Sequence, residues 1–534
     1  MSAACNWFMQ NVSSNSGTPR MPSYYLSVGD SASLSSIFQQ ISGQIVTGGS
    51  ETTLGRNTVV KDIIAPAFTL SDGETESSIQ IETYQCTGKN GNSYTWAATG
   101  IDADGVTAMV NGDQVSVTGF DFSENWCGIE KNEQGTDTVR GRKLVISFTV
   151  KLKSGFLGGN DVLTNKGAGI YKDNTTGTPV LEFNKPTVNV PIQDVTVTAQ
   201  DKNVYLRGNV TADDLKSGAT VTVGDNITLD LSRANDTDMP YGLEPWQTEY
   251  VDITVTVKDA NNNVISDPLS NLSDDTTYTV EVTVSPKTDG STTTQGTPAT
   301  EKTNTDTANI NVFRPALTFK DSNVYYGDNA PADYSGNKVS EKWMHGTTDS
   351  TTVNMLGDKP TLGITYTPDA AKLDNGKYTK QDVPVTAAVS ISGRDVTSYT
   401  TFEHQACTSD CGWTTPANPG APAFLLHVKT CQLTVTKAGG ANDESYVFTV
   451  MKDGAPYSEV SIEGNDSQTI YELPVGTYTV TENPGWRYSA SYSGDATLSA
   501  TTSEGTIICT NTKNNDQWLN GFSAIVRNTF GQKH

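Results

Sequence analysis

Three residues between positions 431 and 513 have the side-chain types needed to form an amide bond within the chain. They are Lys437, Glu482 and Asn511. A lysine amine is a nucleophile only when it is uncharged, and burial away from water favours that form, as it favours the protonated form of a carboxyl group. The three side chains can therefore form such a bond only if the fold buries them together in one apolar interior.

The segment 431–513 has the pattern of half-buried antiparallel strands. Runs of alternating apolar and polar residues are separated by Gly, Pro and Asp turns; they are LTVTK, YVFTVMKDG, VSIEG, QTIYELPVGTYTVTEN and GTIICTNT. This segment resembles the Cna-B (SpaA-like) domain of Gram-positive surface proteins and pilins. That family places a lysine in the first strand, a glutamate after a Tyr-Thr-Val strand and an asparagine in the last strand, as Lys437, Glu482 and Asn511 are placed here.

The resemblance implies an intramolecular isopeptide bond between Lys437 and Asn511. Glu482 would hydrogen-bond the asparagine carbonyl, polarise it and carry a proton to the departing ammonia. If the loop-entropy relation for disulfides is borrowed, closing a loop of about 75 residues stabilises the fold by about 4–5 kcal/mol. The alternative is that Lys437 and Glu482 are surface charges and Asn511 a turn residue, since charged side chains are rarely buried unless paired.

Length and composition predict several domains rich in strands. The chain has 534 residues, 35% of them hydrophobic, which is enough for a core in each of about three to five domains. The formal charge of −24 and the pI near 4.5 argue against nucleic acid or an anionic membrane as a partner. No stretch approaches the length of apolar sequence that crosses a bilayer, so we expect no membrane insertion.

The predicted fold class is mostly β: tandem β-sandwiches of Ig-like and Cna-B type in an elongated rod, with one short N-terminal α-helix. Residues 197–208, VTAQDKNVYLRG, match residues 317–327, LTFKDSNVYYG, and a repeat at about 120 residues indicates two Ig-sized sandwiches. Short connections that contain proline favour a stiff chain of domains. The predicted domains begin with 1–48 and 49–194. The two repeats follow at 195–315 and 316–429, and then the last domain at 430–513 and the tail at 514–534.

The first segment contains YYLSV followed by SLSSIFQQISGQI, a short strand and then apolar residues at helical spacing. These motifs resemble the last strand and helix of a von Willebrand factor A domain in the pilus-tip adhesins of Gram-positive bacteria, so 1–48 would be its truncated end. The metal-binding DxSxS part of such a domain is missing, and we expect no metal site. The alternative is an amphipathic helix docked on the next domain.

The second segment, 49–194, contains GFDFSENWCG and GRKLVISFTVKL, which resemble the β-sandwich that follows the A domain in those adhesins. Related sandwiches often carry their own Lys–Asn bond assisted by an aspartate. The resemblance therefore implies a possible second cross-link between Lys61 and Asn165, with Asp121 as the assisting residue. The alternative is that Lys61 and Asn165 are simply exposed.

Seven cysteines are few for this length, and only four histidines accompany them. No CxxC pair with a second CxxC or an HxxxH partner is present, so a structural zinc site is not expected. Cys86 and Cys127 fall in one predicted domain, and we predict a disulfide between them.

Four further cysteines lie near or within the last domain and allow three connectivities; they are Cys407, Cys411, Cys431 and Cys509. We favour Cys431–Cys509 together with Cys407–Cys411. If Lys437 lies beside Asn511, this choice requires the first strand to bend or the register to differ, because the two cysteines are six and two residues away from them.

Catalysis on an external substrate has little support in the sequence. The four histidines fall in different contexts, and no GxSxG, HExxH, GxGxxG or GxxxxGK[ST] motif is present. We therefore predict a structural and adhesive protein, a pilin or adhesin stalk, whose only chemistry is self-catalysed cross-linking and which needs no cofactor. The expected partners are a protein or glycan ligand on a host or neighbouring cell, and other pilin subunits.

The expected location is the bacterial cell surface. The sequence shows no signal peptide and no LPxTG sorting motif, so we expect a fragment of a longer, cell wall-anchored protein. One alternative is an extracellular protein that binds or hydrolyses carbohydrate, with Trp246 and Trp343 as a sugar platform rather than core anchors. Another is a purely structural spacer; the sequence does not identify the ligand or show whether the protein polymerises.

Overall fold

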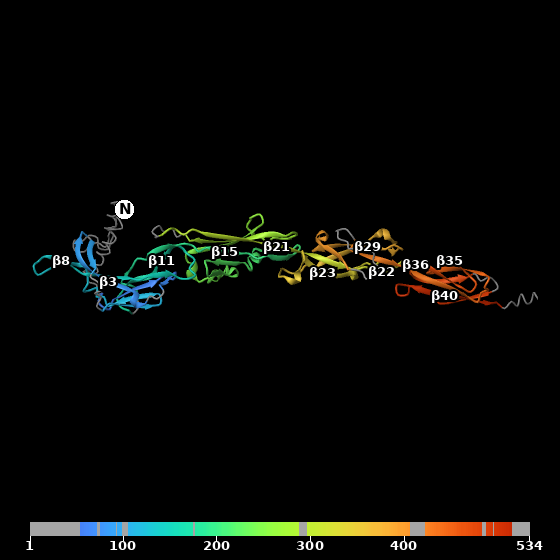
Figure 1. Cartoon of the computed structure of the whole chain (residues 1–534), viewed down its shortest axis with the longest axis horizontal. Helices are drawn as coiled ribbons and strands as arrows, with labels where there is room; N and C mark the ends of the chain where they lie inside the picture. The colour runs from blue at the N-terminus through green and yellow to red at the C-terminus, as the bar shows by residue number, and fades with distance from the viewer. Residues whose placement is uncertain are drawn as a thin grey trace, which may run out of the picture. The chain divides into compact units, whose positions relative to one another are not determined.

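The computed structural model consists mostly of strands (Figure 1), which confirms the predicted mostly β fold class. The structure describes residues 54–71, 75–91, 93–98, 105–174, 177–287, 296–405, 422–482, 488–494 and 496–514. The predicted N-terminal strand and helix, Cys407 and Cys411, and the tail from residue 515 onward lie outside these residues. In the part that is described, the α-helices are α3 (Ala212–Lys216) and α4 (Pro245–Thr248).

The chain divides into two compact units. The first comprises Met1–Ala199, Lys216–Val264 and Thr279–Thr307, and the second comprises Gln200–Leu215, Ile265–Tyr278 and Ala308–His534. Two of the boundaries fall within strands β20 (Thr276–Pro286) and β21 (Lys302–Phe319). Parts of the predicted repeat 195–315 therefore belong to both units, and the predicted domain limits stay predictions.

Among the sheets that lie wholly within the first unit, the largest is antiparallel and has the strand order β13-β12-β1-β6-β5. Residues Val60, Val117 and Ile170 of this sheet form the centre of an apolar cluster. Besides its parts of β20 and β21, the strands of the unit are β1 (Val59–Ile64), β2 (Phe68–Leu70), β3 (Gln80–Asn90), β4 (Ser93–Ala98), β5 (Thr107–Asn111), β6 (Gln114–Thr118), β7 (Gly128–Lys131), β8 (Asp137–Arg140), β9 (Arg142–Ser147), β10 (Val150–Leu152), β11 (Gly159–Leu163), β12 (Asn165–Tyr171), β13 (Leu181–Glu182), β14 (Thr187–Val190), β15 (Val195–Thr198), β17 (Thr220–Val223), β18 (Ile227–Leu229) and β19 (Val251–Asp259).

In the second unit, a strand that begins a repeat pairs in parallel with a strand that ends it. β16 pairs with β21, and β22 pairs with β32. Up to β32, and besides its parts of β20 and β21, the strands of this unit are β16 (Lys202–Tyr205), β22 (Ser322–Tyr325), β23 (Lys338–His345), β24 (Thr348–Asp349), β25 (Met355–Leu356), β26 (Leu362–Pro368), β27 (Leu373–Asp374), β28 (Lys377–Tyr378), β29 (Val383–Ile391), β30 (Arg394–Asp395), β31 (Thr401–His404) and β32 (Phe424–Lys429).

The repeated sequence motif has a repeated structural role. Asp201 accepts a hydrogen bond from the backbone N–H of Asn309 at 2.8 Å, and its counterpart Asp321 accepts one from Leu425 at 2.7 Å. In each repeat, the backbone N–H that lies three residues further along the last strand donates to a second aspartate, at 2.8 Å in both cases. The sequence match between 197–208 and 317–327 therefore marks two copies of one strand arrangement.

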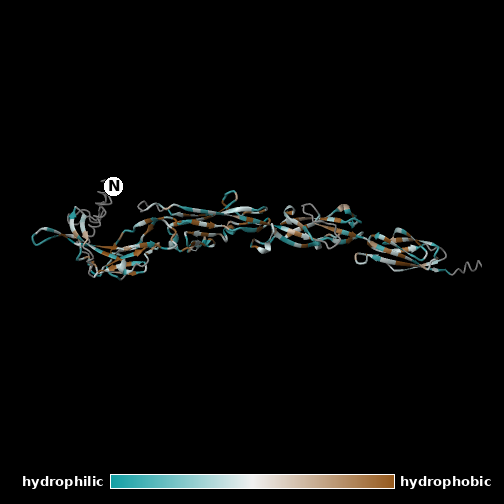
Figure 2. Ribbon diagram, in the orientation of Figure 1, coloured by the Kyte–Doolittle hydropathy of each residue, from teal (hydrophilic) through white to brown (hydrophobic). Residues whose placement is uncertain are grey.

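The C-terminal part of the second unit is a sandwich of two four-stranded sheets, with the orders β36-β33-β40-β38 and β35-β34-β37-β39. Its apolar core includes Leu433, Phe448, Tyr478 and Ile507. Figure 2 shows brown, apolar residues alternating with teal ones along these strands. The strands are β33 (Cys431–Ala438), β34 (Ser445–Lys452), β35 (Ala455–Glu463), β36 (Ser467–Leu473), β37 (Gly476–Glu482), β38 (Tyr488–Ser493), β39 (Ala496–Leu498) and β40 (Glu504–Lys513).

Candidate functional site

The candidate site lies in the interior of the C-terminal sandwich. In one sheet, β33 and β40 run parallel, and Lys437 lies opposite Cys509. Because side chains alternate along a strand, Cys509 and Asn511 share the inward face of β40. In the facing sheet, the last residue of β37, Glu482, also points inward and pairs with Phe448 of β34. Period-two strands from both sheets thus carry four reactive side chains into one apolar space.

The carboxyl group of Glu482 joins the other three side chains. Its Oε2 accepts a hydrogen bond from Lys437 Nζ at 2.7 Å and another from Cys509 Sγ at 3.0 Å. Its Oε1 accepts a hydrogen bond from Asn511 Nδ2 at 2.8 Å. The predicted lysine, glutamate and asparagine are therefore in direct contact, although 74 residues separate the first from the last.

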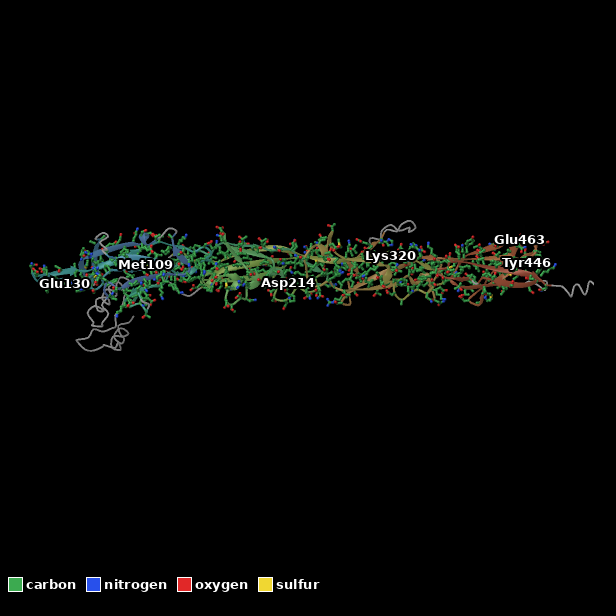
Figure 3. The ribbon with its side chains drawn as sticks, turned by 90° about the horizontal axis from the view of Figure 1, so that it is seen from below. Met109, Glu130, Asp214, Lys320, Tyr446 and Glu463 are labelled. Carbon is green, nitrogen blue, oxygen red and sulfur yellow. The ribbon has the colours of Figure 1, made fainter. Side chains whose placement is uncertain are left out.

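This hydrogen-bonded group is almost entirely removed from water. Lys437 is 1% exposed, Asn511 4% and Glu482 8%. The Lys437 amine lies 4.4 Å from the centre of the Tyr446 ring, and Tyr446 is among the residues labelled in Figure 3. The alternative interpretation, that Lys437 and Glu482 are surface charges, is therefore wrong.

Burial in this apolar space determines which proton arrangement is favourable. Moving one proton along the 2.7 Å hydrogen bond converts an ammonium and a carboxylate into a neutral amine and a carboxylic acid. Burying two charges away from water is costly, whereas a neutral hydrogen-bonded pair avoids most of that penalty. The uncharged amine is the nucleophilic form of Lys437 that amide formation requires.

Each carboxyl oxygen of Glu482 contacts one of the two nitrogens that take part in the reaction. Oε2 contacts the amine of Lys437, and Oε1 contacts the amide nitrogen of Asn511. One carboxyl group can thus remove a proton from the attacking amine and deliver a proton to the leaving nitrogen, as a general base and then a general acid. The geometry suits a condensation that releases ammonia.

The orientation of the asparagine amide differs from the one expected from the sequence. Glu482 contacts the amide nitrogen of Asn511, and the carbonyl oxygen Oδ1 lies instead 3.9 Å from Cys509 Sγ. Sequence reasoning treated Cys509 only as a candidate for a disulfide. Its position two residues before Asn511 was the available signal, because alternate residues of a strand share a face.

The predicted disulfide between Cys431 and Cys509 is wrong. The parallel register places Gln432 opposite Glu504 and Lys437 opposite Cys509, so the two cysteines are six residues apart along the pairing. At about 3.3 Å per residue this is about 20 Å, whereas a disulfide requires Cα atoms within about 7 Å. Both cysteines are free thiols, and neither the strand bend nor the register change that the bond requires is present.

The predicted pair of Cys86 and Cys127 is also not bonded, because both residues are free thiols. They are nevertheless close enough to interact. Burial raises the pKa of Cys127 to about 11, and the neighbouring Cys86 adds to this effect. The Cys86 thiol donates to the backbone carbonyl of Gly88 at 3.7 Å.

The second predicted triple, Lys61, Asp121 and Asn165, is not brought together. Lys61 and Asn165 are both buried, at 8% exposure, which excludes the alternative that they are exposed. However, the Lys61 amine lies over the Tyr171 ring at 4.8 Å, whereas Asn165 hydrogen-bonds Asp62. Consecutive residues of β1 point to opposite faces of the sheet, so Lys61 and Asp62 diverge.

Asp121 has a local role in a turn instead. Its Oδ1 accepts hydrogen bonds from the backbone N–H and the hydroxyl of Ser123, at 3.0 and 2.6 Å. These bonds, chiefly that from the Ser123 hydroxyl, lower the pKa of Asp121. The prediction that Asp121 assists Asn165 is therefore wrong, because the carboxyl group that hydrogen-bonds Asn165 belongs to Asp62.

Sequence reasoning also missed a polar cluster in the second repeat. Asp321 lies 2.8 Å from His404 Nε2 and 3.4 Å from His427 Nε2. Among the residues that the structure describes, no group of three or more His, Cys, Asp and Glu side chains is arranged to hold a metal ion. Trp343 is 1% exposed and packs edge-on against Tyr205, as expected of a core anchor, and Trp246 packs against Phe156.

The sequence matches no protein-family model and no curated protein. Solved structures with some similarity include an adhesin from Mobiluncus mulieris containing intramolecular disulfide, isopeptide and ester bond cross-links, at 11% identity and a TM-score of 0.18, covering 50% of this chain and 99% of that one. The Bacillus anthracis TIE protein has 13% identity and a TM-score of 0.21, over 64% of this chain and 60% of its own. The pilus adhesin SpaC from Lactobacillus rhamnosus GG has 9% identity and a TM-score of 0.18, over 86% of this chain and 57% of its own.

No helix among the described residues is both long enough and apolar enough to cross a bilayer.

Proposed function

We propose that this chain is a structural and adhesive protein of the Gram-positive cell surface whose C-terminal sandwich closes an isopeptide bond between Lys437 and Asn511 without an external enzyme. The observation that carries the proposal is the placement of one oxygen of Glu482 on each of the two nitrogens, at 2.7 and 2.8 Å. A surface ion pair would not be buried in this way, and a metal site would not be built around a lysine amine.

The proposed reaction exchanges one amide for another. Glu482 takes a proton from the Lys437 amine, and Nζ attacks Cγ of Asn511, whose Nδ2 already donates to Glu482 Oε1. Glu482 gives that proton to Nδ2 and takes a second one from Nζ, which leaves Nζ with the single hydrogen of an amide. The Cγ–Nδ2 bond breaks, and ammonia leaves. One Nζ–Cγ bond forms for each Cγ–Nδ2 bond broken, so no cofactor or oxidant is needed.

The position of the bond supports a mechanical role. Lys437 lies in the first strand of the sandwich and Asn511 in the last, and these two strands pair side by side. A covalent tie between them closes nearly the whole sandwich, so tension on the chain would pass through the bond rather than through hydrogen bonds. Such resistance is of use to a stalk that holds a cell to a surface.

The proposed setting is outside the cell, in a longer protein anchored to the cell wall. The net charge of −24 keeps such a chain soluble and disfavours anionic polymers as partners. The proposed partners are a protein or glycan on another cell and, in a pilus, further subunits.

Pulling the full chain by its two ends in a single-molecule force experiment tests the mechanical role. With the bond formed, about 75 residues between Lys437 and Asn511 cannot extend, which shortens the unfolded length by about 250 Å. Lys437→Ala should recover that length, and Lys513→Ala, which changes an exposed lysine of the same sandwich, should not. Equal lengths for the parent and Lys437→Ala would refute the proposal.

A further inference from the structure

Glu482 leaves one atom of the reacting amide unassisted. In the proposed condensation, charge develops on the carbonyl oxygen Oδ1 of Asn511 when Nζ attacks Cγ. Glu482 uses Oε2 for Lys437 and Oε1 for Asn511 Nδ2, so its carboxyl group does not face that oxygen. Acyl-transfer sites usually place a hydrogen-bond donor where such charge develops, and this donor has a large effect on rate.

Cys509 is the side chain that faces Asn511 Oδ1. Its Sγ lies 3.9 Å from Oδ1 and 3.0 Å from Glu482 Oε2, and the residue is fully buried. The backbone fixes this position, because Cys509 and Asn511 are alternate residues on one face of β40 and Cys509 lies opposite Lys437. The thiol therefore lies beside the attacking amine, the proton carrier and the carbonyl oxygen together.

We propose that Cys509 is a further catalytic residue of the cross-linking reaction, whose thiol donates a hydrogen bond to Oδ1 of Asn511 as the tetrahedral intermediate forms. This inference rests on the proposed isopeptide function. Before the reaction, the S–H group donates to the Glu482 carboxylate. Once Glu482 has taken the proton from Lys437, Oε2 is a weaker acceptor and Oδ1 a stronger one, so the thiol turns toward Oδ1.

The protonation state of Cys509 suits a donor. Burial raises the pKa of this thiol to about 12, and the hydrogen bond to Glu482 adds to the effect. The thiol therefore keeps its proton at neutral pH, which a hydrogen-bond donor needs and a thiolate nucleophile does not have. The reaction balances without any change in the cysteine, which is a thiol before and after.

The rate of bond formation tests this role. The full chain is synthesised in a cell-free system under reducing conditions, samples are quenched in acid at intervals, and the digested branched peptide joining Lys437 to Asn511 is quantified by mass spectrometry. We expect Cys509→Ala and Cys509→Val to slow the reaction by about tenfold to a hundredfold, since one lost oxyanion donor costs at least that much in other enzymes. Cys509→Ser, which keeps a donor, should stay within a few-fold of the parent.

A matched control separates this role from packing. Cys431 is equally buried, at 2% exposure, in the same core, but lies six residues from Lys437 along β33. Cys431→Ala should form the bond at the parental rate. Valine fills the core position without a hydrogen-bond donor, so Cys509→Val remains informative if the cavity left by alanine prevents folding.

The possible outcomes are distinct. If the parent forms the bond and Cys509→Val forms it equally fast, the role of Cys509 is refuted and the cross-link stands. If Cys509→Ser is as slow as Cys509→Ala, hydrogen-bond donation is refuted. If the parent itself forms no bond, the proposed function fails together with this inference.

Discussion

Two buried lysines in this chain, Lys437 and Lys61, have the same types of residue nearby but differ in whether those residues share one interior with the lysine. Lys437 and Lys61 each lie on a strand, and each has an asparagine on a neighbouring strand and a carboxyl group close in the sequence or the fold. At Lys437 the three side chains share one apolar interior. At Lys61 the amine lies over Tyr171, while the asparagine and its carboxyl partner, Asp62, meet on the other face of the sheet.

The difference comes from a single step along a strand. The residue types are of the same kind in the two regions, but side chains alternate between the faces of a sheet, so a shift of one residue reverses where a lysine points. Cross-linking at Lys437 therefore requires that its side chain point to the same interior as the glutamate and the asparagine, in addition to the presence of the three residue types.

Removing the shared carboxyl group should have the largest effect. Glu482→Ala leaves Lys437 without its buried partner, which typically costs about 3–5 kcal/mol, and also prevents bond formation. We expect the amides of β33 and β40 to lose their protection in hydrogen exchange, with no branched peptide in a digest.

Glu463→Ala is the control for that variant, because Glu463 is exposed on β35 of the same sandwich. Its effect should stay within about 0.5 kcal/mol. Retention of the cross-link in Glu482→Ala would mean that the carboxyl group does not carry the proton.

Moving the lysine by one residue tests the role of the strand face. In the double variant Thr436→Lys with Lys437→Thr, the amine is transferred to the face where Thr436 contacts Ser467 at 2.9 Å. We expect no cross-link and a loss of about 4–5 kcal/mol, if the loop-entropy relation for disulfides applies. Thr436→Lys alone should keep the bond, and a cross-linked double variant would contradict the argument from alternation.

At the other lysine, the expected effect is small. Lys61→Ala removes the contact with the Tyr171 ring, which is worth about 1–2 kcal/mol for a largely buried amine. The intact mass should change only by the substitution itself. An additional gain of about 17 Da, the mass of one ammonia, would show that Lys61 is cross-linked after all.

The smallest effect concerns Asp62 and pH. Burial raises the pKa of Asp62 in the folded protein, an effect that the hydrogen bond with Asn165 partly offsets. The folded state therefore holds an unfavourable charge at neutral pH and is relieved of it as the pH falls through that raised pKa toward the unfolded value. Asp62→Asn should be slightly more stable than the parent at pH 7, and the difference should shrink in acid; a difference that grows in acid would contradict the sign.

Much of the fold was accessible from the sequence because its signals are local. Alternation along LTVTK and GTIICTNT predicted both the strands and their inward faces. The match between residues 197–208 and 317–327 predicted a repeat, and its aspartates occupy equivalent positions. The inward face of the first and last strands was enough to place Lys437 and Asn511 in one core.

The errors arose where the answer depends on register or on distant parts of the fold. The parallel pairing of β33 with β40 separates Cys431 from Cys509, and nothing in the spacing of the cysteines reveals that register. His404 and His427 meet at Asp321 only because strands far apart in the sequence become neighbours. Asp62 was overlooked because Asn165 is distant in the sequence and comes beside it only through the pairing of β1 with β12.

The most direct test of the central claim is the intact mass of the purified chain under reducing conditions, measured beside Lys437→Ala and Lys513→Ala. The account predicts that the parent and Lys513→Ala are each about 17 Da lighter than their sequences require, because one ammonia is lost per bond, and that Lys437→Ala has its full mass. A parent of unmodified mass, or a deficit that persists in Lys437→Ala, would contradict it.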